Sequence, residues 1–289
     1  MHTPVLLKQV IDNLDIRKDG KYIDATYGEG GHSREIVKRG GNVLAIEYDA
    51  DSINKKIKDR DWMMAGGGWR IEKNIKLVSG NYKDIERIAR QNDFVPVDGI
   101  MFDLGISMEQ ISQSGRGFSY QKLNEPLDMR IDTTLKRTAA DIVNSYSVHE
   151  LYEIFSRYSQ EIDSRPIAEI ISRTRHMKKI QTVGDLVNTI GALMPKKNLE
   201  SRMRRVFQAL RMEVNEELIN IKQGISGALE ILKTEGKLLV ISFNETEDRL
   251  VKNIFKADNR ISRLVKIKSK SDYRFEKTAT LRIAVKTNI

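Results

Sequence analysis

Short apolar runs alternate with helical patterns in the first part of the chain. The runs are too short for helices and are bounded by polar or glycine-rich residues, as is typical of buried parallel strands. They lie at Tyr22–Asp24, Asn42–Glu47, Ile75–Ser79 and Val97–Asp103. Around them, apolar residues at helical spacing predict helices at Val5–Ile11, His32–Lys38, Ala50–Lys58 and Tyr82–Gln91. This alternation predicts a parallel sheet that is covered on both faces.

The alternation stops in the middle of the chain and returns near its end. Thr133–Arg205 is a run of helical patterns without a convincing strand. The elements expected beyond it are helices at Glu213–Leu232 and Glu245–Phe255, a strand at Lys237–Phe243, and a closing pair of strands at Leu264–Lys268 and Thr280–Val285. The prediction is an α/β fold, a doubly wound and mostly parallel sheet of seven strands with a helical insertion. The expected domains are a core of residues 1–132 and 207–289 and an insertion of residues 133–206.

A glycine-rich turn follows the first predicted strand. Gly28, Gly30 and Gly31 let the backbone turn tightly and approach a ligand, and the next helix points free N–H groups at the same space. Glu47 ends the second strand nineteen residues after Gly28, the offset at which a carboxylate can hold both hydroxyls of a ribose. A glycine-rich loop without a ligand is the alternative, but the acidic residue at this offset favours a nucleotide-type cofactor.

The charges near the turn indicate which cofactor fits. A dinucleotide site needs a third glycine where Ser33 stands, because pyrophosphate must lie close to the helix end. Asp24 and Glu29 place negative charge where phosphates would lie, which suits a cationic ligand instead. S-adenosylmethionine carries a sulfonium, an ammonium group and a ribose but no phosphate, so it fits better than NAD.

Polar residues at the strand ends predict the position of the site. Asp24, Glu47, Asp103 and the segment Ser79–Tyr82 all lie at the ends of predicted strands. Ligands of parallel sheets bind beyond the C-terminal ends of the strands, so these residues should converge on one crevice.

Composition excludes several other classes of protein. With 40% hydrophobic and 31% charged residues, the chain is typical of soluble globular proteins, and no apolar run approaches the roughly 18 residues of a membrane span. The N-terminus lacks the basic and apolar regions of a signal peptide. The absence of cysteine excludes thiolate metal sites, and four scattered histidines show no metal-ligand spacing. We therefore expect a cytoplasmic protein without membrane or metal; the sequence does not decide between a monomer and a homodimer.

The net charge of +9 is concentrated in two segments. Residues 173–205 contribute +7 and residues 252–289 contribute +8, so the rest of the chain carries −6. Either segment alone could be a solvated face, but two of them beside an acidic cofactor half favour binding to a nucleic-acid backbone. Phosphate contacts are predicted for Lys178, Lys179, Arg202, Arg204 and Arg205.

Seven motifs spread along the chain together resemble one family. They are His2–Leu7, Asp24–Ser33, Asp103–Ser107, Arg116–Ser119, Pro126–Arg130, Phe207–Asn215 and Leu281–Asn288. In this order and spacing they resemble the bacterial 16S ribosomal RNA cytosine-N4-methyltransferases, which use S-adenosylmethionine. The resemblance runs from His2 to Asn288 and implies methylation of the N4 amino group of cytosine 1402 in the small ribosomal subunit.

The resemblance also implies which residues contact the cofactor. These are Gly30, Gly31, His32, Glu47, Tyr82, Asp103 and Gln110. The chain departs from the family at Glu47, where aspartate is usual, and at Asn244, where histidine is typical. A third departure is the stretch from Trp62 to Trp69, whose three consecutive glycines predict a flexible connection.

The chemistry of methyl transfer suggests catalytic roles for Asp103 and Asn244. The enzyme must align an acceptor nitrogen, the methyl carbon and the sulfur for an in-line displacement. The exocyclic amine of cytosine has its lone pair spread into the ring, and an acceptor for its N–H would localise that pair. Asp103 is expected to serve there, although it could instead bond turn amides, and Asn244 is expected to orient the base.

The loop after Asp103 lacks the prolines and the aromatic ring that amino-methyltransferases often carry at this point. Phe118 or Tyr120 could stack on a flipped base, although a core position suits Phe118 equally well. Arg116 and Arg130 are candidates for phosphate or base-edge contacts, and Arg130 could instead pair with a nearby aspartate.

Two other functions remain open. A ribosome-assembly factor that binds RNA without catalysis is favoured by Asn244, whereas the cofactor loop with Glu47 and Asp103 opposes it. A small-molecule methyltransferase would leave the basic insertion unexplained.

Overall fold

The chain divides into two compact units. The computed structural model describes residues 4–58, 63–65, 69–72, 74–193, 198–271 and 276–287. One unit is Met1–Gly105 with Leu218–Ile289, and the other is Ile106–Glu217. The expected insertion of residues 133–206 lies within the second unit. Its proposed role in RNA recognition stays a prediction.

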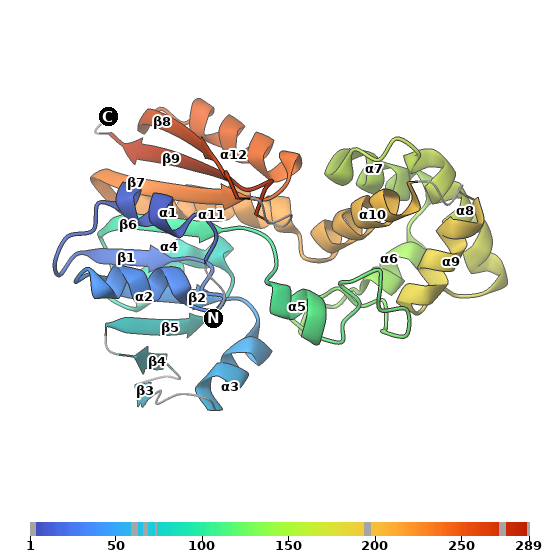
Figure 1. The fold of residues 1–289 in the computed structure, drawn as a ribbon, viewed down its shortest axis with the longest axis horizontal. Coiled ribbons are helices and arrows are strands. Elements are labelled where there is room, and N and C mark those ends of the chain that lie inside the picture. Colours follow the sequence, from blue (N-terminus) through green and yellow to red (C-terminus); the bar gives the residue numbers. More distant parts are fainter. Residues whose placement is uncertain are drawn as a thin grey trace. The chain divides into compact units, whose positions relative to one another are not determined.

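The first unit is built on a sheet of nine strands in the order β3-β4-β5-β2-β1-β6-β7-β9-β8 (Figure 1). The parallel strands are β1 (Lys21–Asp24), β2 (Asn42–Glu47), β5 (Ile75–Ser79), β6 (Val97–Asp103) and β7 (Leu232–Ser242). Antiparallel to β7 runs β9 (Thr280–Lys286), which also pairs with the edge strand β8 (Ile261–Lys268). These seven strands confirm the predicted mostly parallel sheet.

Two further strands extend the other edge of the sheet. β3 (Met63–Ala65) pairs with β4 (Trp69–Glu72), and β4 pairs antiparallel with β5. The prediction of a connection without regular structure was wrong for these residues, because a sheet edge offers backbone partners to a neighbouring segment. The three glycines at 66–68 lie outside the described residues.

Helices cover both faces of this sheet (Figure 1). They are α1 (Leu7–Leu14), α2 (Gly31–Lys38), α3 (Ala50–Lys58), α4 (Ile85–Gln91), α11 (Glu217–Ile231) and α12 (Glu245–Ala257). Alternate residues of β2 point to opposite faces: Val43 and Ala45 share a core with α1, α2 and α3, whereas Leu44 and Ile46 share one with α4, α11 and α12. This burial on both faces explains why the parallel strands are continuous apolar runs in the sequence.

The second unit is largely helical in its described residues. It contains α5 (Met108–Gln113), α6 (Ala139–Ser145), α7 (Val148–Ser159), α8 (Ser164–Met177), α9 (Val183–Leu193) and α10 (Leu199–Val214). Capping boxes at Ser107, Thr138 and Ser147 begin α5, α6 and α7. No helix in the described part of the chain is long and apolar enough to cross a membrane.

Asn215 joins two of the sequence motifs inside the second unit. Its side-chain oxygen accepts a hydrogen bond from Ile131 N–H at 2.7 Å, and its amide nitrogen donates to the Met129 carbonyl at 2.8 Å. Met129 is fully buried and has a φ of +61°. The segment Phe207–Asn215 therefore fixes the strained turn at the end of Pro126–Arg130, and this contact is structural.

Candidate functional site

Three carboxylates end three adjacent strands of the first unit. Asp24 ends β1, Glu47 ends β2 and Asp103 ends β6, and β1 pairs in parallel with both neighbours. Parallel pairing places these ends at one edge of the sheet, which is the arrangement expected from the sequence. With the loop after β1, they form the candidate site.

The loop after β1 needs its glycines for packing as well as for conformation. Gly28 and Gly30 have φ values of +50° and +72°, which side chains rarely adopt. A Cβ atom on Gly30 would lie 2.4 Å from the Tyr27 ring, and one on Gly31 would lie 2.1 Å from Pro4 Cγ. Close packing in the protein therefore requires Gly30 and Gly31 even before a ligand is considered.

Glu47 connects the glycine loop to the end of β2. Its Oε2 accepts a hydrogen bond from Gly28 N–H and its Oε1 accepts one from Asp49 N–H, each at 3.0 Å. The side chain is thus held rigidly at the position from which a carboxylate can bind a ribose.

Asp24 is buried at the end of β1. Its Oδ2 accepts a hydrogen bond from the Ser33 hydroxyl at 2.6 Å, and its Oδ1 accepts one from Thr26 N–H at 3.2 Å. Burial raises the pKa of Asp24 to about 6, against the opposing effect of these hydrogen bonds. In the sequence, Ser33 was notable only because it replaces the third glycine of a dinucleotide site. In the structure, its hydroxyl orients the Asp24 carboxylate.

His32 and Tyr82 are packed inside the first unit. The Nε2 atom of His32 lies 3.2 Å from the Val5 carbonyl, and burial lowers the pKa of the imidazole to about 4. His32 is therefore neutral at physiological pH and ties the N-terminal segment to α2. Tyr82 packs edge-to-face on Phe102, with ring centroids 5.6 Å apart, and lies against Gly224.

The side chain of Asp103 makes no hydrogen bond within the described residues, and its Oδ1 is buried. The backbone N–H of Asp103 donates to Thr26 Oγ1 at 2.6 Å, which fixes the end of β6 beside the glycine loop. Burial first, then the charges of Asp24 and Glu247, raise the pKa of Asp103 to about 8. The structure therefore contradicts the alternative in which the Asp103 carboxylate accepts hydrogen bonds from turn amides.

Asn244 caps α12, and Glu247 lies in the first turn of that helix. The Oδ1 atom of Asn244 accepts a hydrogen bond from Glu247 N–H at 3.0 Å. The Glu247 carboxylate accepts one from Phe243 N–H at 3.0 Å and is buried. Sequence reasoning missed Glu247, although an asparagine followed three residues later by glutamate is the pattern of a capped helix start.

Three residues predicted to contact the cofactor or the base lie in the second unit. The Oε1 atom of Gln110 accepts a hydrogen bond from Ser107 N–H at 2.9 Å and completes the cap of α5. Phe118 is buried, so the core alternative describes it better than a stacking surface. The Tyr120 hydroxyl donates to Glu200 at 3.2 Å. A cofactor contact by Gln110 stays a prediction.

Arg116 and Arg130 also have partners within the second unit. Arg116 donates to the carbonyls of Arg130 and Ile131 at 3.1 and 2.7 Å. Arg130 forms a two-pronged ion pair with Asp128, at 2.6 and 2.8 Å. Both guanidinium groups therefore support the backbone around residues 128–131.

Four of the five basic residues predicted to contact phosphate are paired with carboxylates. The pairs are Lys178–Asp185, Arg202–Asp163, Arg204–Glu200 and Arg205–Glu161, with N–O distances of 2.5 to 2.8 Å. Lys179 and Arg173 are exposed and have no ion pair among the described residues. These two are now the better candidates for phosphate contacts in the segment 173–205.

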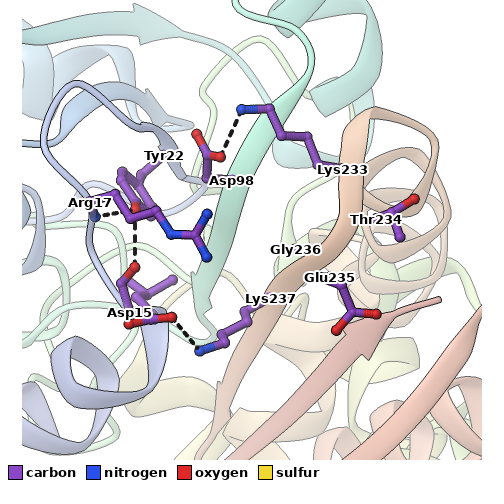
Figure 2. Close-up of a pocket in the computed structure, with 10 residues that line it drawn as sticks. Asp15, Arg17, Tyr22, Asp98, Lys233, Thr234, Glu235, Gly236 and Lys237 are labelled. Atoms are coloured by element: carbon purple, nitrogen blue, oxygen red, sulfur yellow. Dashed lines mark hydrogen bonds and ion pairs between the residues drawn. The ribbon is translucent and has the colours of Figure 1, made fainter.

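A pocket also lies at the opposite end of the sheet, beside the starts of β1, β6 and β7 (Figure 2). Two of its carboxylates form ion pairs: Lys233 Nζ lies 2.7 Å from Asp98 Oδ1, and Lys237 Nζ lies 3.4 Å from Asp15 Oδ2. Tyr22, which accepts a hydrogen bond from Arg17 N–H at 2.8 Å, completes the wall. These contacts join α1 to the sheet, and the strand-end carboxylates lie away from them.

The chain is similar to proteins of one family over nearly its whole length. A family model described as the MraW methylase family matches residues 1–283. A relative from Cytophaga hutchinsonii, named ribosomal RNA small subunit methyltransferase H, is 39% identical over 254 residues, which cover 87% of this chain and 81% of that protein. Proteins of the same name from Carboxydothermus hydrogenoformans and Thermomicrobium roseum are 39% and 40% identical; each alignment covers 89% of this chain, and 81% and 77% of those proteins.

Proposed function

The chain belongs to the MraW methylase family, and we propose that it is an S-adenosylmethionine-dependent methyltransferase that acts on RNA of the small ribosomal subunit. Its curated relatives are named for that activity. The modification that we propose is methylation of N4 of cytosine 1402 in 16S ribosomal RNA, in the cytoplasm. The observation that carries the proposal is the buried Oδ1 of Asp103, which has no hydrogen-bond partner among the described residues and lies at the strand edge that also holds Glu47.

The residues at the strand ends fit the chemistry of S-adenosylmethionine. Glu47 would hold the ribose hydroxyls, because its carboxylate is already fixed by two backbone N–H groups. The charged groups that act on Asp103 are both carboxylates, those of Asp24 and Glu247, which suits a cation. When bound, S-adenosylmethionine supplies a methyl group on a positively charged sulfur.

The protein's own part in the transfer is to hold the acceptor amine. Asp103 would accept the N–H of the cytosine amine, so that the nitrogen lone pair is directed at the methyl carbon. No side-chain base is needed afterwards, because methylation makes the nitrogen acidic enough to lose its proton to water. The Asn244 oxygen caps α12, so only its amide N–H groups would orient the base.

The decisive experiment uses labelled S-adenosylmethionine and small subunits from a strain that lacks the enzyme. Nucleoside analysis should find the label in N4-methylated cytidine from position 1402. Binding of the subunit without transfer of label would instead favour the assembly-factor function. A homodimer stays a prediction and is tested by sedimentation of the same preparation.

We expect Glu47→Ala to weaken binding of S-adenosylmethionine by about 1–3 kcal/mol, the cost of lost charge-assisted hydrogen bonds. The same change releases Gly28 N–H and Asp49 N–H, so the glycine loop should also loosen. Calorimetry measures the affinity. Asp51→Ala is the control, because it removes an exposed carboxylate from the first turn of α3, just beyond Glu47; equal losses in both variants would contradict the assignment.

Adjacent lysines offer a test of the RNA surface. Lys179 has no ion pair in the described residues, whereas Lys178 is paired with Asp185. We expect Lys179→Gln to lower the slope of log affinity against log salt by about 0.7–0.9, the effect of one lost phosphate contact. Lys178→Gln should change that slope less, because its charge is already neutralised. Equal slopes for wild type and Lys179→Gln, measured with 16S RNA, would mean that this face is only solvated.

Asn244→Ala should affect both stability and rate. Loss of the cap of α12 should lower the free energy of unfolding by about 1 kcal/mol. If the amide also orients the base, the single-turnover rate should fall by the equivalent of about 1–3 kcal/mol. Asn244→Ser keeps a capping oxygen but has no amide N–H, so it should restore stability and leave the rate low. A serine variant with the wild-type rate would limit Asn244 to capping.

A further inference from the structure

Two carboxylates from different elements act on a third, that of Asp103, in the first unit. Asp24 ends β1, Asp103 ends β6, and Glu247 lies in the first turn of α12. Asp24 and Glu247 are both almost completely buried, and the Oδ1 of Asp103 is buried as well. Three like charges in such a place repel strongly, so the group with the fewest hydrogen-bond donors should carry a proton.

The donors are unequally distributed among the three carboxylates. Asp24 accepts hydrogen bonds from the Ser33 hydroxyl and from Thr26 N–H. Glu247 accepts one from Phe243 N–H, and the start of a helix stabilises negative charge. The side chain of Asp103 accepts none among the described residues. The proton therefore belongs on Asp103.

The charge of Glu247 is held in a defined place. Asn244 accepts the Glu247 N–H, and the Glu247 carboxylate accepts the Phe243 N–H, so backbone and side chain are both fixed at the end of β7. The charged groups that act on Asp103 are Asp24 and Glu247. Both disfavour a second or third negative charge nearby, and both favour a cation.

We propose that Glu247 is a positioning residue that makes this site select a positively charged sulfur over a neutral one. The inference rests on the proposed function, in which S-adenosylmethionine is the methyl donor and S-adenosylhomocysteine the product. Asp103 loses its proton to solvent when the cationic sulfur binds, and the resulting carboxylate can accept the N–H of the substrate amine. It regains the proton when the neutral thioether replaces the cation, which weakens the hold on the product.

Proton release on binding tests this inference directly. Titration calorimetry at pH 7 in two buffers of different ionisation heat should count about one proton released with S-adenosylmethionine, since a single group is linked to binding. S-adenosylhomocysteine should release none. Between pH 6.5 and 7.5, above the pKa of about 6 of Asp24 and below that of about 8 of Asp103, affinity for S-adenosylmethionine should rise about tenfold per pH unit, the slope for release of one proton. Affinity for the product should stay flat.

Glu247→Gln and Glu245→Gln form a matched pair for the second test. Both remove one charge from the first turn of α12, but Glu245 is exposed whereas Glu247 is buried beside Asp103. Glu247→Gln should reduce the preference for S-adenosylmethionine over the product about tenfold and move proton release to lower pH. Glu245→Gln should do neither.

The outcomes separate the inference from the proposed function. Binding of both ligands with no proton released, and with the same pH dependence for each, would overturn the inference and leave the function intact. Failure to bind either ligand would overturn both. If Glu247→Gln does not fold, as judged by circular dichroism, the proton count in the unmodified protein still decides.

Discussion

Asp103→Ala should lower the single-turnover rate of methyl transfer about a hundredfold or more, the range for loss of one preorganised hydrogen-bonding group that acts in the transition state. Its buried Oδ1 has no other hydrogen-bond partner among the described residues, so nothing else in the protein depends on that oxygen. We therefore expect a folded variant with a defective reaction. Rapid quenching with labelled cofactor and excess enzyme measures the rate.

Asp103→Asn separates the hydrogen bond from the charge. The asparagine oxygen can still accept the amine N–H, but the side chain cannot become negative. We expect an intermediate rate that no longer depends on pH between 6.5 and 8. A loss at Asn244→Ala greater than that at Asp103→Ala would reverse the roles assigned to the two residues.

Protein stability provides an independent measure of the same carboxyl group. The pKa of Asp103 is about 8 in the folded protein and near 3.8 when exposed, so the folded state binds the proton over that interval. Its contribution to stability is complete below the lower value and declines as the pH rises toward 8. Asp24, whose pKa is about 6, adds to this decline in stability only at lower pH. The decline above pH 6 is therefore due to Asp103, and Asp103→Asn should remove it. An unchanged profile of unfolding free energy against pH would contradict the buried proton.

The sheet and the edge of the candidate site were readable from local patterns. Strands buried on both faces appear as apolar runs, and the polar residue that ends each run marks the C-terminal edge of a parallel sheet. The sequence alone therefore predicts that Asp24, Glu47 and Asp103 lie close together. The helical content of residues 133–206 followed in the same way from spacing alone.

Contacts between residues far apart in sequence could not be read in this way. Arg205 pairs with Glu161 across 44 positions, and Arg202 with Asp163 across 39. The sequence therefore overestimates the positive charge that residues 173–205 offer to RNA, because it does not show which basic side chains are already paired with carboxylates. The same limit applies to Glu247, whose proximity to Asp103 depends on the pairing of β6 with β7.

The strands β3 and β4 were missed for a related reason. β4 is four residues long and is defined by its pairing with β5, and β3 by its pairing with β4. Short strands at the edge of a sheet have little apolar signature of their own, because only part of their surface is covered. The three glycines between β3 and β4 predict irregular structure, and this signal outweighed the weak strand pattern of the residues beside them.

Asn215→Ala should lower the free energy of unfolding of the second unit by about 3 kcal/mol, because each buried backbone group left without a partner costs about 1–3 kcal/mol. The variant strands two such groups, the Ile131 N–H and the Met129 carbonyl. It also frees a fully buried residue with a φ of +61° from the contact that holds it in place. Urea denaturation measures the loss.

Hydrogen exchange should place the effect at residues 129–131. Asn124→Ala is the control, because this asparagine lies in the same loop segment but is exposed, and a surface change of this kind should cost less than about 0.5 kcal/mol. If Asn215 served the reaction instead, Asn215→Ala would keep wild-type stability and lose activity. The two buried hydrogen bonds argue for the opposite result: methyl transfer should fall only as far as the folded fraction falls, and lower temperature should restore both together.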